Sequence, residues 1–333
     1  MDPATVALTR RRQGPHTTMT DLATRPTVAA ATPEPLRSRH GRAVGQRALV
    51  PWLYILPALI LVVGVVYAGI GYTGWVSTFD WSGIDDSWKA VGLGNYEKVF
   101  ADRVFWTALR HVIVFGVITI LVQMVLGLTM AVLLSGDAAR GKGVYKVVMF
   151  LPVVLAPAAV ATAFRSILNP TGQLNTLLGA VLPGQVETAW LADPRLGLYA
   201  IAAINIWQWT GFSFLLYQAA ISQIDQNLFE AASLDGASFF QTVRWVLLPQ
   251  LSGTHATLAL TGCIGALKTF DIVYLTTGGG PGRSTEFLTT YIYKQVIEQY
   301  HAGYSAALSV VLLVLALLLT AVQIRAYRFG RDE

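Results

Sequence analysis

The chain alternates between long apolar segments and short polar ones. A run of about 18 or more apolar residues with few charges indicates a helix that can cross a hydrocarbon core about 30 Å thick. By this measure six spans are expected, at about 51–76, 107–134, 144–168, 197–222, 251–276 and 303–326. The pattern therefore predicts an all-α polytopic membrane protein with about six transmembrane helices.

The composition agrees with a membrane protein, because 54% of the residues are hydrophobic and 13% are charged, against about 25% charged in soluble domains. The net charge is +5. Its basic residues flank the apolar segments and form no groove with interleaved aromatic residues, so no nucleic-acid partner is expected. A single cysteine excludes an internal disulfide, and His40, His255 and His301 are too scattered to predict a metal site.

Lysine and arginine predict the orientation, because cytoplasmic loops carry an excess of them. They gather before the first span, between the second and third, in the 223–250 loop and after the last span. Both termini are therefore expected in the cytosol. We expect a disordered cytoplasmic tail over 1–48, a transmembrane domain over 49–328 and a second tail over 329–333. Met19 is an alternative start of translation, which the intact mass of the native protein would test.

A polar island interrupts the apolar pattern after the fourth span. Asp225 is a favourable N-cap for a helix from about Gln226 to Leu234. Gly236 tolerates the left-handed conformation that ends a helix. Ser238 and Gln241 have the spacing of a capping box, which predicts a second helix from about Phe239.

Both helices of this island are too short to be stable in isolation. Leu228, Phe229 and Ala232 share one face of the first helix, and such an apolar face requires a groove to lie in. Pro249 disfavours helical geometry at Leu248, so we expect the next span to begin there. An interfacial amphipathic hairpin without a partner is the simpler alternative.

The sequence of the island is specific. Glu-Ala-Ala, three residues, Gly, nine residues and then aliphatic-x-Leu-Pro resembles the "EAA" coupling loop of binding-protein-dependent ABC transporter permeases. The loop spans 224–249, and the ATPase-coupling residues that the resemblance implies are Glu230, Ala231, Ala232, Asp235, Gly236, Leu248 and Pro249. Val246 stands where isoleucine is commoner in the family.

Further segments are similar to the first-type permease of a two-permease sugar importer. They are 91–96, 150–154, 270–274, 276–282 and 303–307, whereas His111 departs from the Asn or Thr expected there. The resemblance implies a type I ABC importer permease fold in a bacterial plasma membrane. It also implies a second permease subunit, two ATPase subunits that bind ATP and Mg²⁺, and an extracytoplasmic binding protein. No catalytic residue and no cofactor are expected in this chain.

One segment imitates a nucleotide site. Residues 136–143, GDAARGKG, nearly spell a phosphate-binding P-loop, but Gly143 stands where the magnesium-binding Ser or Thr belongs and no strand precedes the segment. A short cytosolic turn is the better interpretation, and ATP chemistry is assigned to a partner.

The glycine-rich segment after the fifth span has two interpretations. Glycine lets another chain approach closely, and proline blocks continuation of a helix. The resemblance implies a docking rim for the binding protein at Gly278, Gly279, Gly280 and Pro281. The alternative is a plain connector to an interfacial helix near 285–299.

The substrate path is expected where polar groups lie in the spans, because such groups are costly unless they face protein or water. Asn205, Gln208 and Trp209 share one face of the fourth span, and Tyr217 is a weaker candidate on another face. Ordinary helix–helix hydrogen bonding is the alternative. Lys268 and Asp271, three apart in the fifth span, are interpreted as a local neutralising pair on that path.

The substrate is expected to be a sugar or oligosaccharide, with glycerol phosphate or a polyol as alternatives in the same family. A phosphate ester would call for Arg or Lys along the path, where Lys268 and Arg165 are available. A secondary carrier, the alternative from another class, would need an ion-coupling site near the midplane and an internal repeat, and neither is evident in the sequence.

Overall fold

The computed structural model describes residues 50–135, 141–182 and 187–329. The chain divides into two units, residues 1–59 and 60–333, which are described separately. In the first unit lies most of helix α1 (Val50–Leu61), whose side chains from Trp52 onward are all exposed. An apolar helix without a buried face requires lipid or another protein around it. The predicted tails at 1–48 and 329–333 lie outside the described residues, except for Phe329.

The helix continues into the second unit through the π-helical turn η1 (Val62–Tyr67) and α2 (Ala68–Val76). Together these segments cover Trp52–Val76 as one apolar stretch of membrane-spanning length. The first predicted span is therefore confirmed as a helix.

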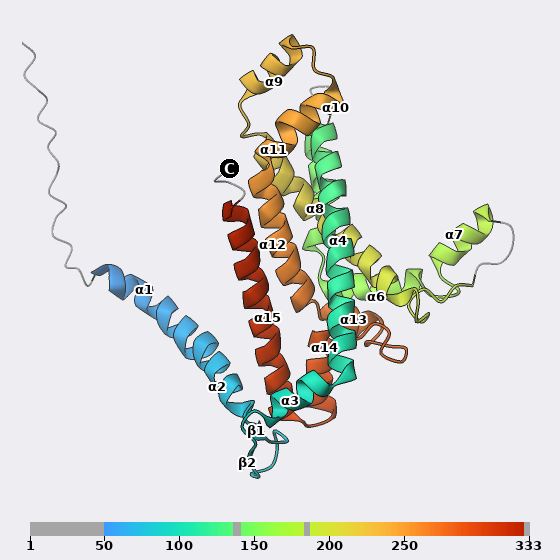
Figure 1. Ribbon diagram of the computed structural model, residues 1–333. Coiled ribbons are helices and arrows are strands. Elements are labelled where there is room, and N and C mark those ends of the chain that lie inside the picture. The colour runs from blue at the N-terminus through green and yellow to red at the C-terminus, as the bar shows by residue number, and fades with distance from the viewer. Residues whose placement is uncertain (1–49, 136–140, 183–186, 330–333) are drawn as a thin grey trace, which may run out of the picture. The chain divides into compact units, whose positions relative to one another are not determined.

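Four long helices dominate the described part of the second unit: α4 (Arg103–Ser135), α8 (Gly197–Ile221), α12 (Ser252–Lys268) and α15 (Ala302–Phe329) (Figure 1). α4 packs against α8 and α12, and α12 packs against α15. Small residues allow the closest crossings, as is common between membrane helices. A Cβ on Gly127 of α4 would lie 2.8 Å from the Phe214 nitrogen of α8.

The third predicted span is not one straight helix. It consists of α5 (Lys142–Val154) and α6 (Pro157–Ile167), which meet at an angle of 94°. Pro157 lies at the start of α6 and disfavours helical geometry in the residue before it. Ala156 accordingly has an extended backbone (φ −61°, ψ 134°), and the helix breaks there.

The fifth predicted span is also interrupted. α12 ends at Lys268, and a short helix α13 (Asp271–Thr276) follows after Thr269 and Phe270. α13 packs against α6, so the two interrupted spans contact each other through the segments that follow their breaks.

Six apolar segments lie where the sequence predicts them, but they differ in kind. In the described ranges, three single helices are long and apolar enough to cross a membrane, or four segments if the bent α5–α6 pair counts as one. α12 has only 17 residues. α8 has 25 residues but falls outside that set. Both helices contribute polar side chains to the cavity described below.

The remaining elements lie at the two ends of the bundle (Figure 1). At one end are α9 (Gln226–Leu234), α10 (Phe239–Thr242), the π turn η2 (Val243–Leu247) and α11 (Leu248–Gln250). At the other end are the strands β1 (Phe79–Asp80) and β2 (Lys89–Ala90), and the helices α3 (Gly94–Ala101), α13 and α14 (Leu288–Tyr293), the last continued by the π turn η3 (Lys294–Glu298). A further helix, α7 (Gln173–Val181), follows α6.

The β1–β2 end is held to the bundle by backbone contacts. β1 and β2 pair antiparallel, and buried Asn95 of α3 donates to the carbonyls of Ser77 and Phe79 at 2.9 and 2.8 Å. Gly303 of α15 donates its N–H to the Trp81 carbonyl at 3.0 Å. A Cβ on Gly303 would meet the Phe79 carbonyl oxygen, so only glycine permits this contact.

Candidate functional site

A cavity of about 390 Å³, lined by both polar and apolar side chains, lies between α4, α8 and the break between α12 and α13. Its size falls within the range of small-molecule sites. Five of the six residues predicted for the substrate path line it: Asn205, Gln208, Trp209, Lys268 and Asp271. The structure therefore brings into one cavity side chains that are far apart in the sequence, such as Asn205 of α8 and Asp271 of α13.

The two amides of the predicted path are held by neighbouring elements. Gln123 of α4 donates from Nε2 to Asn205 Oδ1 at 3.0 Å. Gln208, only 3% exposed, donates from Nε2 to the Leu155 carbonyl at 3.2 Å. That carbonyl lies at the α5–α6 break, where the helix no longer supplies a donor. Gln208 thus combines the two interpretations left open by the sequence: it lines the cavity and makes a helix–helix hydrogen bond.

Gln123 is a cavity residue that the sequence interpretation missed. It is the only carboxamide in the segment 107–134, and a polar group in an apolar span requires protein or water beside it. This signal could have identified it, but its partner Asn205 lies 82 residues away.

The predicted neutralising pair of Lys268 and Asp271 does not form. Thr269 is extended (φ −62°, ψ 117°) and Phe270 is non-helical (φ −130°, ψ −61°), so the helix that would have placed the pair on one face is broken between them. In the described ranges the ion pairs are Lys98–Asp80 and Lys294–Glu286. Lys268 and Asp271 instead both line the cavity.

Tyr217 lies elsewhere. It is fully buried, and its hydroxyl lies 2.7 Å from Nδ1 of His255 in α12. It belongs to an apolar cluster with Phe214, Leu247 and Leu251, next to the helices of the polar island. The structure thus separates Tyr217 from the other predicted path residues.

The polar island has the local geometry that the sequence predicts. α9 covers Gln226–Leu234, and the Asp225 side chain accepts from the Asn227 N–H at 3.0 Å. Gly236 has a φ of +74°. The Ser238 N–H donates to Gln241 Oε1 at 2.7 Å, and the second helix begins at Phe239.

The prediction for Pro249 is wrong. Leu248 is helical (φ −58°, ψ −43°), and the helix breaks only at Leu251 (φ −87°, ψ 6°). A proline normally clashes with the carbonyl four residues earlier and leaves it without a donor. Here the π turn Val243–Leu247 ends directly before Leu248 and includes Trp245, four positions before the proline, and such a widened turn relieves the conflict.

The island exposes large apolar side chains on both of its short helices. Glu230 is exposed, whereas Ala232 is buried and Leu247 anchors the second helix in the bundle. Large side chains that remain exposed are Leu228, Leu234, Phe239, Phe240 and Trp245. An apolar patch of this kind beside polar residues marks a protein–protein or membrane interaction site.

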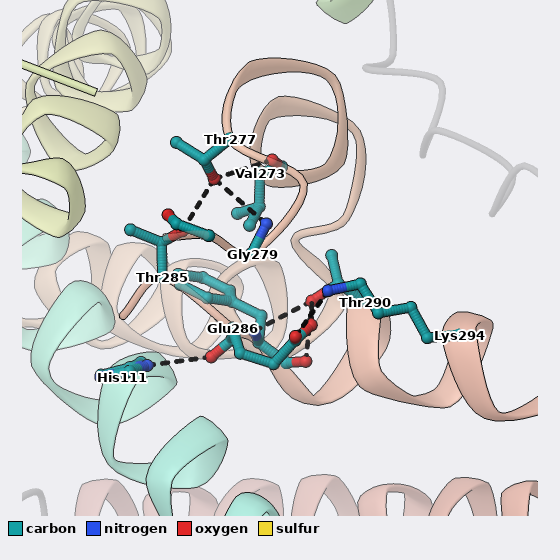
Figure 2. Close-up of polar contacts among 10 residues, drawn as sticks. His111, Val273, Thr277, Gly279, Thr285, Glu286, Thr290 and Lys294 are labelled. Atoms are coloured by element: carbon teal, nitrogen blue, oxygen red, sulfur yellow. Dashed lines mark hydrogen bonds and ion pairs between the residues drawn. The ribbon is translucent and has the colours of Figure 1, made fainter. Parts of the chain in front are cut away.

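The glycine-rich loop between α13 and α14 is a defined structure. Gly278, Gly279 and Gly282 have φ values of 60°, 84° and 55°, which L-residues with side chains rarely adopt. Thr277 and Thr285 close the base of the loop through a hydroxyl–hydroxyl hydrogen bond of 2.7 Å (Figure 2). Pro281 and Gly282 are exposed at its tip. The loop is therefore ordered, which is compatible both with a docking rim and with a plain connector.

Interrupted helices around a cavity, with an exposed helix pair at one end of the bundle, are compatible with the permease class of transport proteins. Residues 123–327 match the family described as binding-protein-dependent transport system inner membrane component. This chain belongs to that family, and it is a multi-pass membrane component of a binding-protein-dependent transport system.

Curated relatives match over most of their length. The probable ABC transporter permease protein YurN of Bacillus subtilis is 34% identical over 87% of this chain and 100% of its own. The lactose transport system permease protein LacF of Rhizobium radiobacter is 31% identical, covering 83% and 93%. The sn-glycerol-3-phosphate transport system permease protein UgpA of Agrobacterium fabrum is 31% identical, covering 83% and 94%.

The fold is shared with a solved structure. A chain of a bacterial ABC transporter involved in the import of the acidic polysaccharide alginate superposes with a TM-score of 0.73. The match has 21% sequence identity and covers 84% of this chain and 94% of that one. This likeness establishes the type I importer permease fold.

Proposed function

We propose that this chain is one of two permease subunits of an ATP-driven importer, and that it moves a sugar or oligosaccharide delivered by an extracytoplasmic binding protein. The observation that carries the proposal is the pair of short helices at one end of the bundle, on which Glu230 and several large apolar side chains are exposed. The glycine-rich loop precedes α14, which lies at the opposite end. A subunit that relays a nucleotide-driven motion to a bound ligand needs partner surfaces at both ends.

In this proposal the chain itself hydrolyses nothing. Two ATPase subunits bind ATP and Mg²⁺, and they contact the loop 224–249. Glu230 pairs with a basic residue of the ATPase, and Gly236 permits the turn between the two short helices. Both termini lie in the cytosol, on the side of the coupling loop. Closure of the ATPase pair then rocks the spans from inward-open to outward-open around the cavity.

The chemistry of the cavity supports a sugar. Trp209 is 40% exposed and lines the cavity, and aromatic faces stack on the C–H faces of sugars. Amide groups such as that of Asn205 can hydrogen-bond hydroxyls. Lactose and alginate, named for the relative LacF and for the solved transporter, are of this class.

A second substrate class is favoured by one observation. Lys268 lines the cavity and has no ion-pair partner among the described residues. A cation there could hold a phosphate ester, and the relative UgpA is named for sn-glycerol-3-phosphate. A polyol in the same family is the uncharged version of this alternative.

Copurification tests the class. The tagged chain is purified from native membranes in mild detergent, the accompanying chains are identified by mass spectrometry, and ATPase activity is measured on the same fraction. We expect a P-loop ATPase and a second permease, and Glu230→Arg should lower their recovery. A lone chain without ATPase activity, from cells that express the neighbouring subunits, would favour a secondary carrier.

Competition experiments test the substrate. Uptake of radiolabelled sugars is measured in intact cells with and without excess lactose, maltose, glycerol or sn-glycerol-3-phosphate. Inhibition by the neutral disaccharides supports the proposal. Inhibition by sn-glycerol-3-phosphate alone supports the phosphate-ester alternative.

A further inference from the structure

Glu286 is a buried carboxylate beneath the glycine-rich loop. It is 1% exposed and lies between the loop and α14. A charge in such a position is costly unless it is paired and hydrogen-bonded. The substrate cavity does not include it, so transport through that cavity does not explain its presence.

All of its polar atoms have partners that come from different elements (Figure 2). Its Oε2 accepts from Lys294 Nζ at 2.6 Å, and its Oε1 accepts from the Thr290 hydroxyl at 2.6 Å. Its backbone carbonyl lies 3.0 Å from Nδ1 of His111 in α4. One residue thus joins the loop, the η3 turn and α4, and His111, the residue that departs from the family pattern, makes one of these contacts.

The loop is shaped around this carboxylate. A Cβ on Gly279 would lie 2.8 Å from Glu286 Oε1 and 2.9 Å from Oε2. Gly279 also has a φ of +84°, so both space and backbone conformation require glycine there. The loop backbone therefore rests directly on the carboxylate.

The base of the loop is closed by hydrogen bonds of its own. Thr285 Oγ1 donates to the Gly280 carbonyl at 2.8 Å, and the Gly279 N–H donates to Thr277 Oγ1 at 3.2 Å. The Glu286 N–H donates to the Arg283 carbonyl at 3.2 Å. What the loop exposes is its tip, Pro281, Gly282 and Arg283.

We propose that Glu286 and Lys294 are positioning residues that hold the glycine-rich loop in one preformed shape for the extracytoplasmic binding protein. The inference rests on the proposed function for the identity of that partner. A loop that is already ordered loses less conformational entropy when a partner docks. The ion pair keeps the loop ordered because opening it would expose or unpair the buried carboxylate.

Limited proteolysis tests the shape of the loop without any partner. Trypsin cleaves after Arg283, which is exposed at the tip but whose carbonyl is hydrogen-bonded. The full-length chain in detergent is digested briefly, and the fragment that ends at Arg283 is followed by intact mass spectrometry. Lys294→Met leaves Glu286 buried and unpaired, so we expect cleavage at Arg283 to accelerate by about tenfold or more.

Two further variants separate the pair from general misfolding. Glu286→Gln combined with Lys294→Met removes both charges, so its cleavage should be slower than that of Lys294→Met alone. Lys98→Met is the matched control, because Lys98 pairs with Asp80 at 3.9 Å while both side chains are more than half exposed, and exposed pairs contribute little. Equal cleavage in Lys294→Met, Lys98→Met and the unaltered chain would overturn the proposal.

The second measurement concerns the partner. In proteoliposomes with the assembled transporter, the binding-protein concentration that half-saturates ATPase stimulation should rise several-fold in Lys294→Met, while basal ATPase activity stays unchanged. Lower basal activity with unchanged half-saturation would instead mean that the pair is merely structural. If the binding protein stimulates no variant, including the unaltered chain, the proposed function fails, whereas faster cleavage at Arg283 would still show that the pair orders the loop.

Discussion

Gly211 of α8 lies directly against Met149 of α5, so closely that a Cβ on Gly211 would collide with the Met149 carbonyl oxygen. The contact lies in the second half of α5, which ends at Val154. It is also near Gln208, whose amide hydrogen-bonds the Leu155 carbonyl at the break that follows. Two features therefore hold the bent third span against α8. Gly211 has no side chain to obstruct the contact, and the Gln208 side chain hydrogen-bonds the break.

Gly211→Val should separate α5 from α8 and destabilise the fold, because the added atoms would meet backbone that cannot rotate away. Overpacking of this kind costs about 1 to 3 kcal/mol or more. The measurement is thermal aggregation of the detergent-solubilised complex. Gly265→Val is the matched control, since Gly265 lies in α12 with nothing within 4 Å of its Cβ position. Equal loss in both variants would refute the tight contact.

Gln208→Leu should destabilise the α5–α6 bend, because the Leu155 carbonyl loses the donor that now lies 3.2 Å away. A buried acceptor left without a partner costs about 1 to 3 kcal/mol. Gln208→Met, which has a similar volume and no donor, should behave alike. If either variant matches the unaltered protein in thermal stability, the amide has no structural part and only the path interpretation remains.

Gly236→Asp and Glu230→Arg should uncouple transport while membrane insertion stays intact. The first places a side chain at a φ of +74°, which strains the turn between α9 and α10, and the second reverses the charge that is expected to meet the ATPase. Uptake in cells should fall at least about tenfold with unchanged protein levels in the membrane, if about 1.4 kcal/mol of coupling is lost. Normal import by either variant would contradict the coupling assignment.

Lys268→Gln distinguishes the two substrate classes, because Lys268 lines the cavity outside any ion pair of the described residues. For a neutral sugar, the maximal uptake rate should change less than about threefold. For a phosphate ester, loss of a charge-assisted hydrogen bond should lower it by about tenfold or more. Asp271→Asn removes a negative charge from the same cavity, and it should lower the uptake of a phosphate ester less than Lys268→Gln does.

Asp102 provides a pH test at the β1–β2 end of the bundle. Burial alone would raise the pKa of its carboxyl, but hydrogen bonds from the Tyr291 hydroxyl, the Val104 N–H and the Tyr304 hydroxyl, with the charge of Arg283, outweigh it and lower the pKa below the usual value. A lowered pKa in the folded state means stabilisation that is full above the unfolded pKa and is lost as pH falls through the folded one.

The difference in melting temperature between the unaltered protein and Asp102→Asn should therefore be constant from neutral pH to about pH 5 and shrink below about pH 4. Differential scanning fluorimetry in detergent measures it. A difference that stays constant down to the lowest pH at which the protein remains folded would show that the Asp102 carboxylate is not preferentially ionised in the folded state.

Local physics was sufficient for the parts of this protein that are built from neighbouring residues. Apolar length indicated where the helices lie, and the Asp225 cap, the Gly236 turn and the Ser238–Gln241 capping box predicted the island to the residue. Each of these features depends on groups within a few positions of one another, so spacing alone defines them. Pro249 is the exception, because its effect depended on the π turn Val243–Leu247 before it.

Tertiary structure decided everything that depends on distant partners. It broke the fifth span between Lys268 and Asp271, so the expected pair became two separate cavity residues. It paired Gln123 with Asn205 and buried Glu286 against Lys294 and Gly279. The sequence pattern shows that a residue is polar, but it does not show which distant residue forms its hydrogen bond. In a membrane, that partner determines whether the polar group only stabilises helix packing or forms part of a binding site.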